Sequence, residues 1–213
     1  MKTVADLRAI ASGSRAWAQR SRMPSPAPGR WTRAALGSCL AELSGGAGAP
    51  SLTLACRLVR EVQQQGEPVA WVTRPGSVFY PPDLADGGID LAALPVIRLD
   101  DARDRLRAAD QLARSGAFGL LVLDLVEDDP CLPLAVQSRL SEQAIAHGAL
   151  VLCLTMKTER QPSLGSLVTV RGQARRIRRV DGRYACRVEV LKDKRRGPGW
   201  TDEEHRRGPD GVR

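Results

Sequence analysis

The residues whose types and spacing come closest to a known chemistry lie in a glycine-rich stretch, residues 42–59 (ELSGGAGAPSLTLACRLV). A loop of the form G-x-x-x-x-G-K-[ST] holds nucleotide phosphates through backbone amides, a lysine, and a hydroxyl that ligates magnesium. Here Gly45 begins the loop, but Pro50, Ser51 and Leu52 occupy the last three places of that pattern. Proline removes an N–H, serine carries no charge, and leucine cannot ligate a metal. The stretch therefore predicts the framework of a nucleotide site without its chemistry.

The elements around this loop are those that would position a phosphate. Residues 41–44 lead into it as a strand, and residues 52–65 follow with apolar side chains at helical spacing, ending at Gly66. Residues 68–73 (PVAWVT) then form a short apolar run suited to a buried parallel strand. The loop thus lies inside a strand, loop, helix, strand unit.

The rest of the chain continues this alternation and predicts an α/β fold with one mostly parallel sheet flanked by helices. Further strands are expected within 90–99, 119–124 and 149–155, and helices over 101–115 and 134–147. Beyond them, strands are expected over 168–171, 173–180 and 183–191, with a tight turn at Asp181 and Gly182, which predicts an antiparallel hairpin.

Asp124 ends the most strand-like run, GLLVLD. A carboxylate at this place can belong to the magnesium side of a phosphate site, or it can cap the following turn. Because Ser51 stands where a lysine would be needed, we favour the capping interpretation.

Charge is distributed unevenly along the 213 residues, whose net charge is +8 and whose apolar content is 43%. Residues 157–213 hold 16 Lys and Arg against 8 Asp and Glu, whereas residues 1–156 hold 16 of each. This excess indicates either a polyanionic partner or a solvated face without one. The five scattered cysteines indicate reduced thiols, and the start of the chain lacks a hydrophobic signal core, so we expect a cytoplasmic protein that does not enter membranes.

We expect three regions. Residues 1–30 combine an amphipathic helix and a proline-rich linker, residues 31–199 form the core, and residues 200–213 form a polar, disordered tail. The helix should dock either on its own domain or on a neighbouring subunit. Its apolar face carries Val4, Leu7, Ile10 and Trp17.

Several segments together resemble the RecA recombinase core over residues 36–200. They are the stretch 42–59, SGAFGLLVLDLV, the helix around QSRLSEQA, and VEVLKDK, which occur in the RecA order and spacing. Within RecA-like proteins, FYPPDLADGGIDLAALPVIR and VLKDKRRGPG resemble the ImuA family, accessory proteins of damage-induced mutagenesis related to the division inhibitor SulA.

The resemblance implies that the nucleotide site has degenerated. Ser51 stands at the phosphate-binding lysine and Leu52 at the magnesium hydroxyl, Pro75 lies where RecA proteins place the water-activating glutamate, and Met156 replaces a glutamine that senses phosphate. Neither ATP nor Mg²⁺ is expected as a cofactor, and no ATPase activity is expected. The vestigial site comprises Gly45, Gly46, Pro50, Ser51, Leu52, Pro75, Asp124 and Met156.

Residues 157–166 correspond to the second mobile loop of RecA, which lies along single-stranded DNA, but this stretch looks short. Lys192 and Lys194 match paired lysines that reach a neighbour's nucleotide in RecA filaments. A basic patch for DNA or for a protein partner is expected from Arg171, Arg175, Arg176, Arg178, Arg179, Lys192, Lys194, Arg195 and Arg196.

Two functions from different classes follow from the resemblance. In the first, the protein is a non-catalytic interaction module of translesion synthesis that binds an inactive Y-family polymerase homologue, RecA, or both, and in contacting RecA would limit recombination. In the second, it is an ATP-independent DNA-binding protein that acts on single-stranded DNA through its basic C-terminal region and is nucleoid-associated when bound. Self-association is left open by both.

Overall fold

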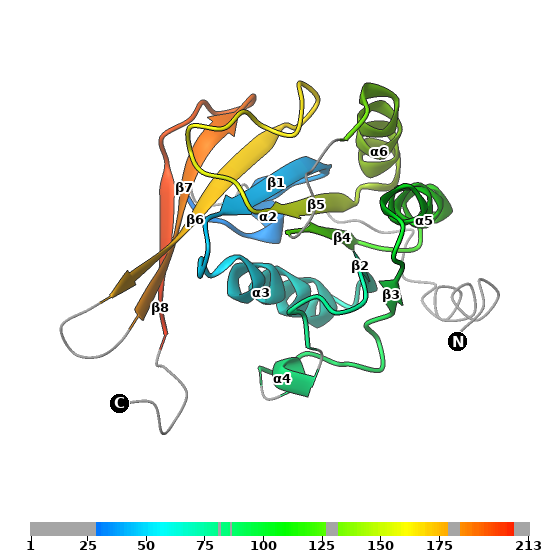
Figure 1. Cartoon of the computed structure of the whole chain (residues 1–213), viewed down its shortest axis with the longest axis horizontal. Helices are drawn as coiled ribbons and strands as arrows, with labels where there is room; N and C mark the ends of the chain where they lie inside the picture. The colour runs from blue at the N-terminus through cyan, green and yellow to red at the C-terminus, as the bar shows by residue number, and fades with distance from the viewer. Residues whose placement is uncertain (1–28, 81, 86, 127–131, 179–183, 207–213) are drawn as a thin grey trace.

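A computed structural model of the chain describes residues 29–80, 82–85, 87–126, 132–178 and 184–206. Its centre is an eight-stranded sheet of order β3-β2-β4-β5-β1-β6-β7-β8, flanked by helices (Figure 1). Strands β1 to β6 pair in parallel, whereas β7 joins β6 and β8 joins β7 through antiparallel ladders. The predicted α/β class, with a mostly parallel sheet and antiparallel C-terminal strands, is confirmed at this level. The strands are β1 (Cys39–Gly45), β2 (Val69–Thr73), β3 (Val96–Arg98), β4 (Leu120–Leu125), β5 (Leu150–Thr155), β6 (Val170–Arg178), β7 (Tyr184–Asp193) and β8 (Thr201–Arg206).

Helix α3 (Ser51–Gln64) covers one face of the sheet. Its apolar side chains Leu54, Leu58 and Val62 recur at helical spacing and are fully buried against the apolar residues of β1, β2 and β4. The chain leaves the helix through Gly66, whose φ of +75° favours glycine. The short α2 (Arg33–Leu36) and α4 (Pro82–Ala85) lie on the same side of the sheet as α3 in Figure 1.

Helices α5 (Ala102–Ser115) and α6 (Leu134–His147) cover the opposite face. The Asp101 side chain accepts hydrogen bonds from the backbone N–H groups of Arg103 and Asp104, which starts α5, and Gly116 ends it with a left-handed φ of 65°. Both helices lie over a second apolar core, so the central strands are buried on both faces.

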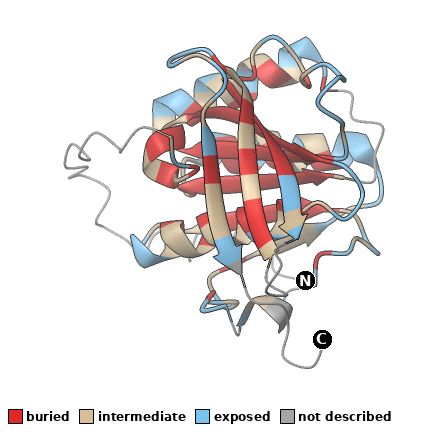
Figure 2. Ribbon diagram, turned by 90° about the vertical axis from the view of Figure 1, so that its left-hand side faces the viewer, coloured by how far each residue is buried: buried red, intermediate tan, exposed pale blue. Residues whose placement is uncertain are grey.

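Strands β6, β7 and β8 extend the sheet beyond its helix-covered part. Figure 2 faces these strands and shows exposed and intermediate bands along them, whereas β1, β2, β4 and β5 are buried throughout. The two strands expected over 168–171 and 173–180 are one strand, β6, with an irregular register between Arg171 and Gly172. Gly172 is required there, because a Cβ atom would lie 2.5 Å from a methyl of Val188 and 2.7 Å from the Trp31 ring.

The disordered tail predicted from residue 200 onward is wrong for residues 201–206. They form β8, which pairs antiparallel with β7. Asp202 is only 7% exposed; its carboxylate accepts a hydrogen bond from the Trp31 N–H at 3.0 Å and pairs with Arg57 of α3 at 2.6 Å. Because its acidic side chains meet fixed donors, this polar segment is ordered.

Several predictions lie outside the described residues. They concern the N-terminal amphipathic helix with Val4, Leu7, Ile10 and Trp17, the turn at Asp181 and Gly182, Arg179, and residues 207–213.

Candidate functional site

The glycine-rich loop after β1 closes on itself. The Ala49 N–H donates to the Gly46 carbonyl at 3.0 Å, and Pro50 precedes the first turn of α3. A Cβ atom at Gly45 would lie 2.5 Å from the Ala49 methyl and 2.6 Å from the Ser51 hydroxyl oxygen. Ser51 is itself buried, so its side chain occupies space beside Gly45 rather than facing an open site.

The residues of this loop do not fit a nucleotide triphosphate with magnesium. No lysine or arginine occurs between Gly45 and Leu52, and Pro50 offers no N–H to a phosphate. The Ala49 N–H is already used inside the turn. Leu52 packs against the apolar core, where RecA-like sites would need a hydroxyl. We therefore derive no step through ATP or a metal ion.

The other residues of the expected vestigial site lie at the ends of neighbouring strands. Asp124 of β4 accepts from the Thr73 hydroxyl of β2 at 3.0 Å and from the Val126 N–H at 3.2 Å. The second contact confirms that Asp124 caps the turn after its strand. Pro75 and Met156 follow β2 and β5 and are exposed.

The strongest polar centre was not predicted from the sequence. Glu42 lies in the middle of β1 with no exposed surface. Its carboxylate accepts from the Thr155 hydroxyl at 3.0 Å, from the Ser163 hydroxyl at 2.8 Å and from the Leu164 N–H at 2.9 Å. Lys157 lies 3.4 Å from the same carboxylate. A buried charge persists only when it is paired and hydrogen-bonded, and Glu42 meets both conditions.

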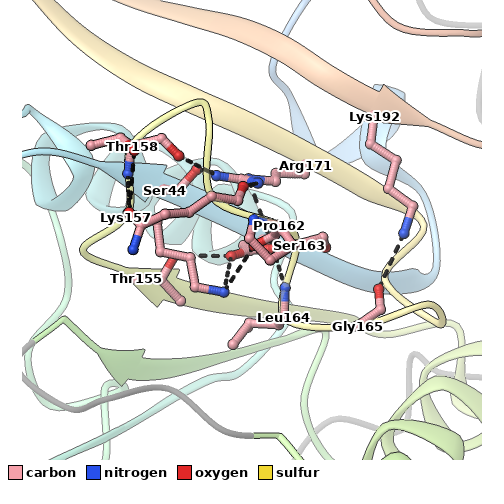
Figure 3. Close-up of polar contacts among 12 residues, drawn as sticks. Ser44, Thr155, Lys157, Thr158, Pro162, Ser163, Leu164, Gly165, Arg171 and Lys192 are labelled. Atoms are coloured by element: carbon pink, nitrogen blue, oxygen red, sulfur yellow. Dashed lines mark hydrogen bonds and ion pairs between the residues drawn. The ribbon is translucent and has the colours of Figure 1, made fainter.

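Glu42 and Arg171 together fix the segment between β5 and β6, residues 156–169. Arg171 of β6 donates to the Thr158 carbonyl at 2.8 Å, to the Gln161 carbonyl, and to the Ser44 hydroxyl at 3.1 Å. Figure 3 shows the Arg171 side chain lying between Ser44 and the segment whose carbonyl groups it contacts. This segment, which we call the β5–β6 loop, is held at several points along its length.

Arg171 therefore cannot serve in the basic patch predicted for it. It is only 3% exposed, and its guanidinium is used by the β5–β6 loop and Ser44. The half-buried Lys192 of β7 also contacts the β5–β6 loop, where its ammonium group donates to the Gly165 carbonyl at 3.1 Å (Figure 3). Burial and the nearby charge of Lys194 lower the pKa of Lys192, although Glu42 opposes this. The sequence could not reveal these contacts, because the carbonyl partners lie far along the chain.

The last two arginines of the predicted patch lie beside Asp193, the last residue of β7. Asp193 accepts from the N–H groups of Arg195 and Arg196, from the Arg196 side chain at 2.9 Å and from the Trp200 indole N–H at 3.2 Å. Burial alone would raise the pKa of Asp193, but these hydrogen bonds hold it below its ordinary value. Arg195 donates to the Leu36 carbonyl, so these two cations stabilise the end of β7.

Arg195 and Arg196 are nevertheless exposed, as are Lys194 and three arginines of β6. Arg176 lies over the Tyr184 ring, 5.0 Å from its centroid, and Arg175 pairs with Glu159 and with Glu189. Lys194 and Arg178 are exposed as well. The structure thus divides the predicted patch into an internal part, Arg171 and Lys192, and two exposed parts, one on β6 and one just after β7.

Arg175 and Arg176 of the exposed part on β6 line a cleft of about 600 Å³. The cleft lies between the glycine-rich loop, the start of the β5–β6 loop and the far half of β6. Its lining comprises Gly46, Ala47, Gly48, Ala49, Thr158, Glu159, Arg160, Gln173, Ala174, Arg175, Arg176 and Ile177. Two residues were not expected from the sequence: Arg160, which lines this cleft, and Glu42, which holds the β5–β6 loop. The available signal for Glu42 was a carboxylate inside the apolar strand CLAELS.

The chain matches neither a known family model nor a curated protein. Within the described residues, no helix combines the length and the apolar character needed to span a membrane, and no group of three or more His, Cys, Asp and Glu side chains is arranged to hold a metal. The functional conclusions therefore depend on the residues of the site and on their geometry.

Proposed function

We propose that this chain is a non-catalytic RecA-like accessory protein of DNA-damage-induced translesion synthesis, resembling ImuA and acting in the cytoplasm. It binds an inactive Y-family polymerase homologue, RecA, or both, and by contact with RecA it would limit recombination. It neither binds nor hydrolyses ATP. The motif resemblance supports the family, and the sheet order with a glycine-rich loop after β1 is compatible with it.

One observation carries the proposal. The glycine-rich loop keeps its position between β1 and α3, but its interior is filled by Ala49 and Ser51 and it holds no cation. Phosphoryl transfer depends on electrostatic stabilisation of the phosphates, which this loop cannot supply. We therefore propose that the protein acts by binding other proteins through its surface, and not by phosphoryl transfer.

A RecA-like surface without a nucleotide would limit recombination by interrupting a RecA filament. In RecA-like filaments, ATP joins neighbouring subunits. A subunit with a matching surface but no nucleotide would join the end of a filament and fail to extend it. This step rests on the resemblance and applies only if the chain contacts RecA.

The test is a pull-down of purified RecA and of the purified polymerase homologue on the immobilised chain. We expect at least one of them to bind, and binding of the polymerase homologue should be the same with and without ATP and Mg²⁺. A column carrying an unrelated protein of similar net charge is the control. If neither protein is retained above this control, the proposal is wrong.

A second candidate is direct binding of single-stranded DNA, favoured by exposed Arg176 and Arg178, which make no ion pair within the described part of the chain. Phosphate contacts make the logarithm of affinity fall with the logarithm of salt concentration, by about 0.7 per neutralised phosphate. Charge reversal of both arginines should then abolish binding, whereas reversal of exposed Arg103 and Arg107 on α5 should not. If the affinity for single-stranded DNA changes neither with salt concentration nor with reversal of Arg176 and Arg178, this candidate is wrong.

A further inference from the structure

The sheet has an open edge where β6 extends past β1. Strand β1 pairs with β6 only as far as Gly45, which lies opposite Ala174. Strand β6 continues to Arg178, and among the described strands only β7 pairs with this continuation. Alternate residues over 175–178 therefore direct backbone N–H and C=O groups to the side that β1 no longer covers. An open edge of this kind is a template for an additional strand.

This open edge lines the cleft described above, and a second stretch of bare main chain lines it too. The cleft includes residues 46–49 and 158–160 together with residues 173–177 of β6. A Cβ atom at Gly46 or at Gly48 would meet no atom within 4 Å. Another main chain can therefore approach the loop closely from inside the cleft.

The charge of the cleft is mainly positive. Arg160, Arg175 and Arg176 line it against one carboxylate, that of Glu159. Arg160 makes no ion pair with any described residue, and Arg176 lies over the Tyr184 ring rather than against a carboxylate. Arg175 already holds the carboxylates of Glu159 and Glu189. One guanidinium group of the cleft, that of Arg175, thus already binds carboxylates within the fold.

The remaining lining is apolar. Ala47, Ala49, Ala174 and Ile177 contribute small or branched hydrocarbon surface beside the arginines. Main-chain edge, apolar surface and two available guanidinium groups together match a peptide strand whose side chains alternate between apolar and acidic. A nucleic-acid strand has no peptide N–H and C=O groups to pair with β6, so it would leave the open edge unpaired.

We infer that this cleft binds an extended acidic segment of a partner protein, which adds as a strand to residues 175–178 and directs carboxylates to Arg160 and Arg176. The inference rests on the proposed function, for which it supplies the chemistry of the partner. Hydrogen bonds to the main chain provide affinity, and the arginines select for acidic side chains.

The first experiment uses a fluorescein-labelled peptide of alternating glutamate and valine, with binding to the whole chain followed by anisotropy. Reversal of Arg160 or Arg176 to glutamate should weaken binding by roughly tenfold, because an attraction becomes a repulsion. Arg103→Glu on α5 is the matched control and should leave affinity unchanged. Equal affinity for all four proteins would overturn the inference.

The second experiment tests the strand geometry. Two versions of the peptide carry N-methyl groups on one or the other alternate set of residues, which removes the N–H donors of one edge only. Addition to β6 uses one edge, so one version should lose binding and the other should keep it. If both bind as well as the parent peptide, the main chain is not involved and the inference is wrong. Displacement of the peptide by an unlabelled oligothymidine would also reject it, in favour of a nucleic-acid ligand.

Failure here is distinguishable from failure of the proposed function. The pull-down of RecA and the polymerase homologue is repeated with the chain carrying both R160E and R176E. Loss of retention supports the cleft as the interface. Full retention shows that the chain binds its partner through another surface, which rejects the cleft while the proposed function stands.

Discussion

Glu42 is the residue on which the polar interior of this protein depends. Its carboxylate is fully buried in β1 and receives hydrogen bonds from β5 and from the β5–β6 loop. If the Glu42 carboxylate is removed, its buried donors lose their acceptor and stay out of contact with water. The resulting loss of stability exceeds the net stability that the intact set of hydrogen bonds provides. Glu42 and Arg171 are thus two of the side chains that hold the β5–β6 loop against β1 and β6.

Replacement of Glu42 by glutamine tests this role. The charge opposite Lys157 and Arg171 is lost, so we expect the free energy of unfolding to fall by about 2–4 kcal/mol. Amide exchange at Leu164 should accelerate more than exchange in α5. Urea denaturation and hydrogen exchange measure the two effects.

Ser163→Ala is the matched control for Glu42→Gln, because it removes one hydrogen bond to the same carboxylate without changing any charge. It should cost about 1 kcal/mol. Equal losses for the two variants would show that the charge of Glu42 does not hold the loop.

The buried thiols predict how stability depends on alkaline pH. Burial raises the pKa of Cys39 from 9.0 to about 11, although Arg195 and Arg33 oppose the shift, and burial also raises the pKa of Cys153. The folded state therefore keeps the Cys39 proton where the unfolded chain releases it. Stability from this difference is complete below pH 9 and is lost as pH rises toward about 11. Urea denaturation of the wild-type chain should show a steeper decline in this range than that of Cys39→Ala, and parallel profiles would contradict the assignment.

At the scale of elements, β8 joins the sheet to α3. Asp202 and Glu204 both pair with Arg57, at 2.6 and 3.2 Å, and Arg57 also donates to the Trp31 carbonyl. Trp31 packs near Trp200, with ring centroids 6.3 Å apart. The segment before α2 and the segment after β7 are thereby fastened to each other and to α3.

Asp202→Ala tests this connection. The substitution leaves the Trp31 N–H and one guanidinium contact of Arg57 without their acceptor inside the fold, so a loss of about 3 kcal/mol is expected. Glu203→Ala is the control on the same strand; Glu203 pairs with half-exposed Arg187, and its loss should cost less than about 1 kcal/mol. Thermal denaturation of the two variants gives the comparison. Equal melting temperatures would show that β8 adds little.

The helices and inner strands were predicted well from the sequence, because the spacing of apolar residues along a segment shows which of its faces is buried. Helix α6 begins and ends at the predicted residues, and α5 begins one residue after its predicted start, with Asp101 as its cap. Prediction failed at β8, because nothing in the composition of TDEEHR indicates the arginine that pairs with it. It also failed at Arg171, where a cation in a basic region is buried by backbone carbonyls. Both failures concern contacts between segments far apart in the chain.

At the scale of the whole molecule, helices cover both faces of the central strands, and the glycine-rich loop and the cleft lie at the ends of β1, β5 and β6. There the glycine-rich loop, the fixed β5–β6 loop and the open edge of β6 meet around one cleft. The role that we propose for this region is protein recognition rather than nucleotide chemistry.

The most direct test of that central claim is a titration of the purified chain with a fluorescent ATP analogue and Mg²⁺, followed by anisotropy and competed with unlabelled ATP. Because residues 45–52 hold no cation to bind a triphosphate and Pro50 offers it no N–H, we expect no saturable signal. Saturable binding that unlabelled ATP displaces would contradict the claim.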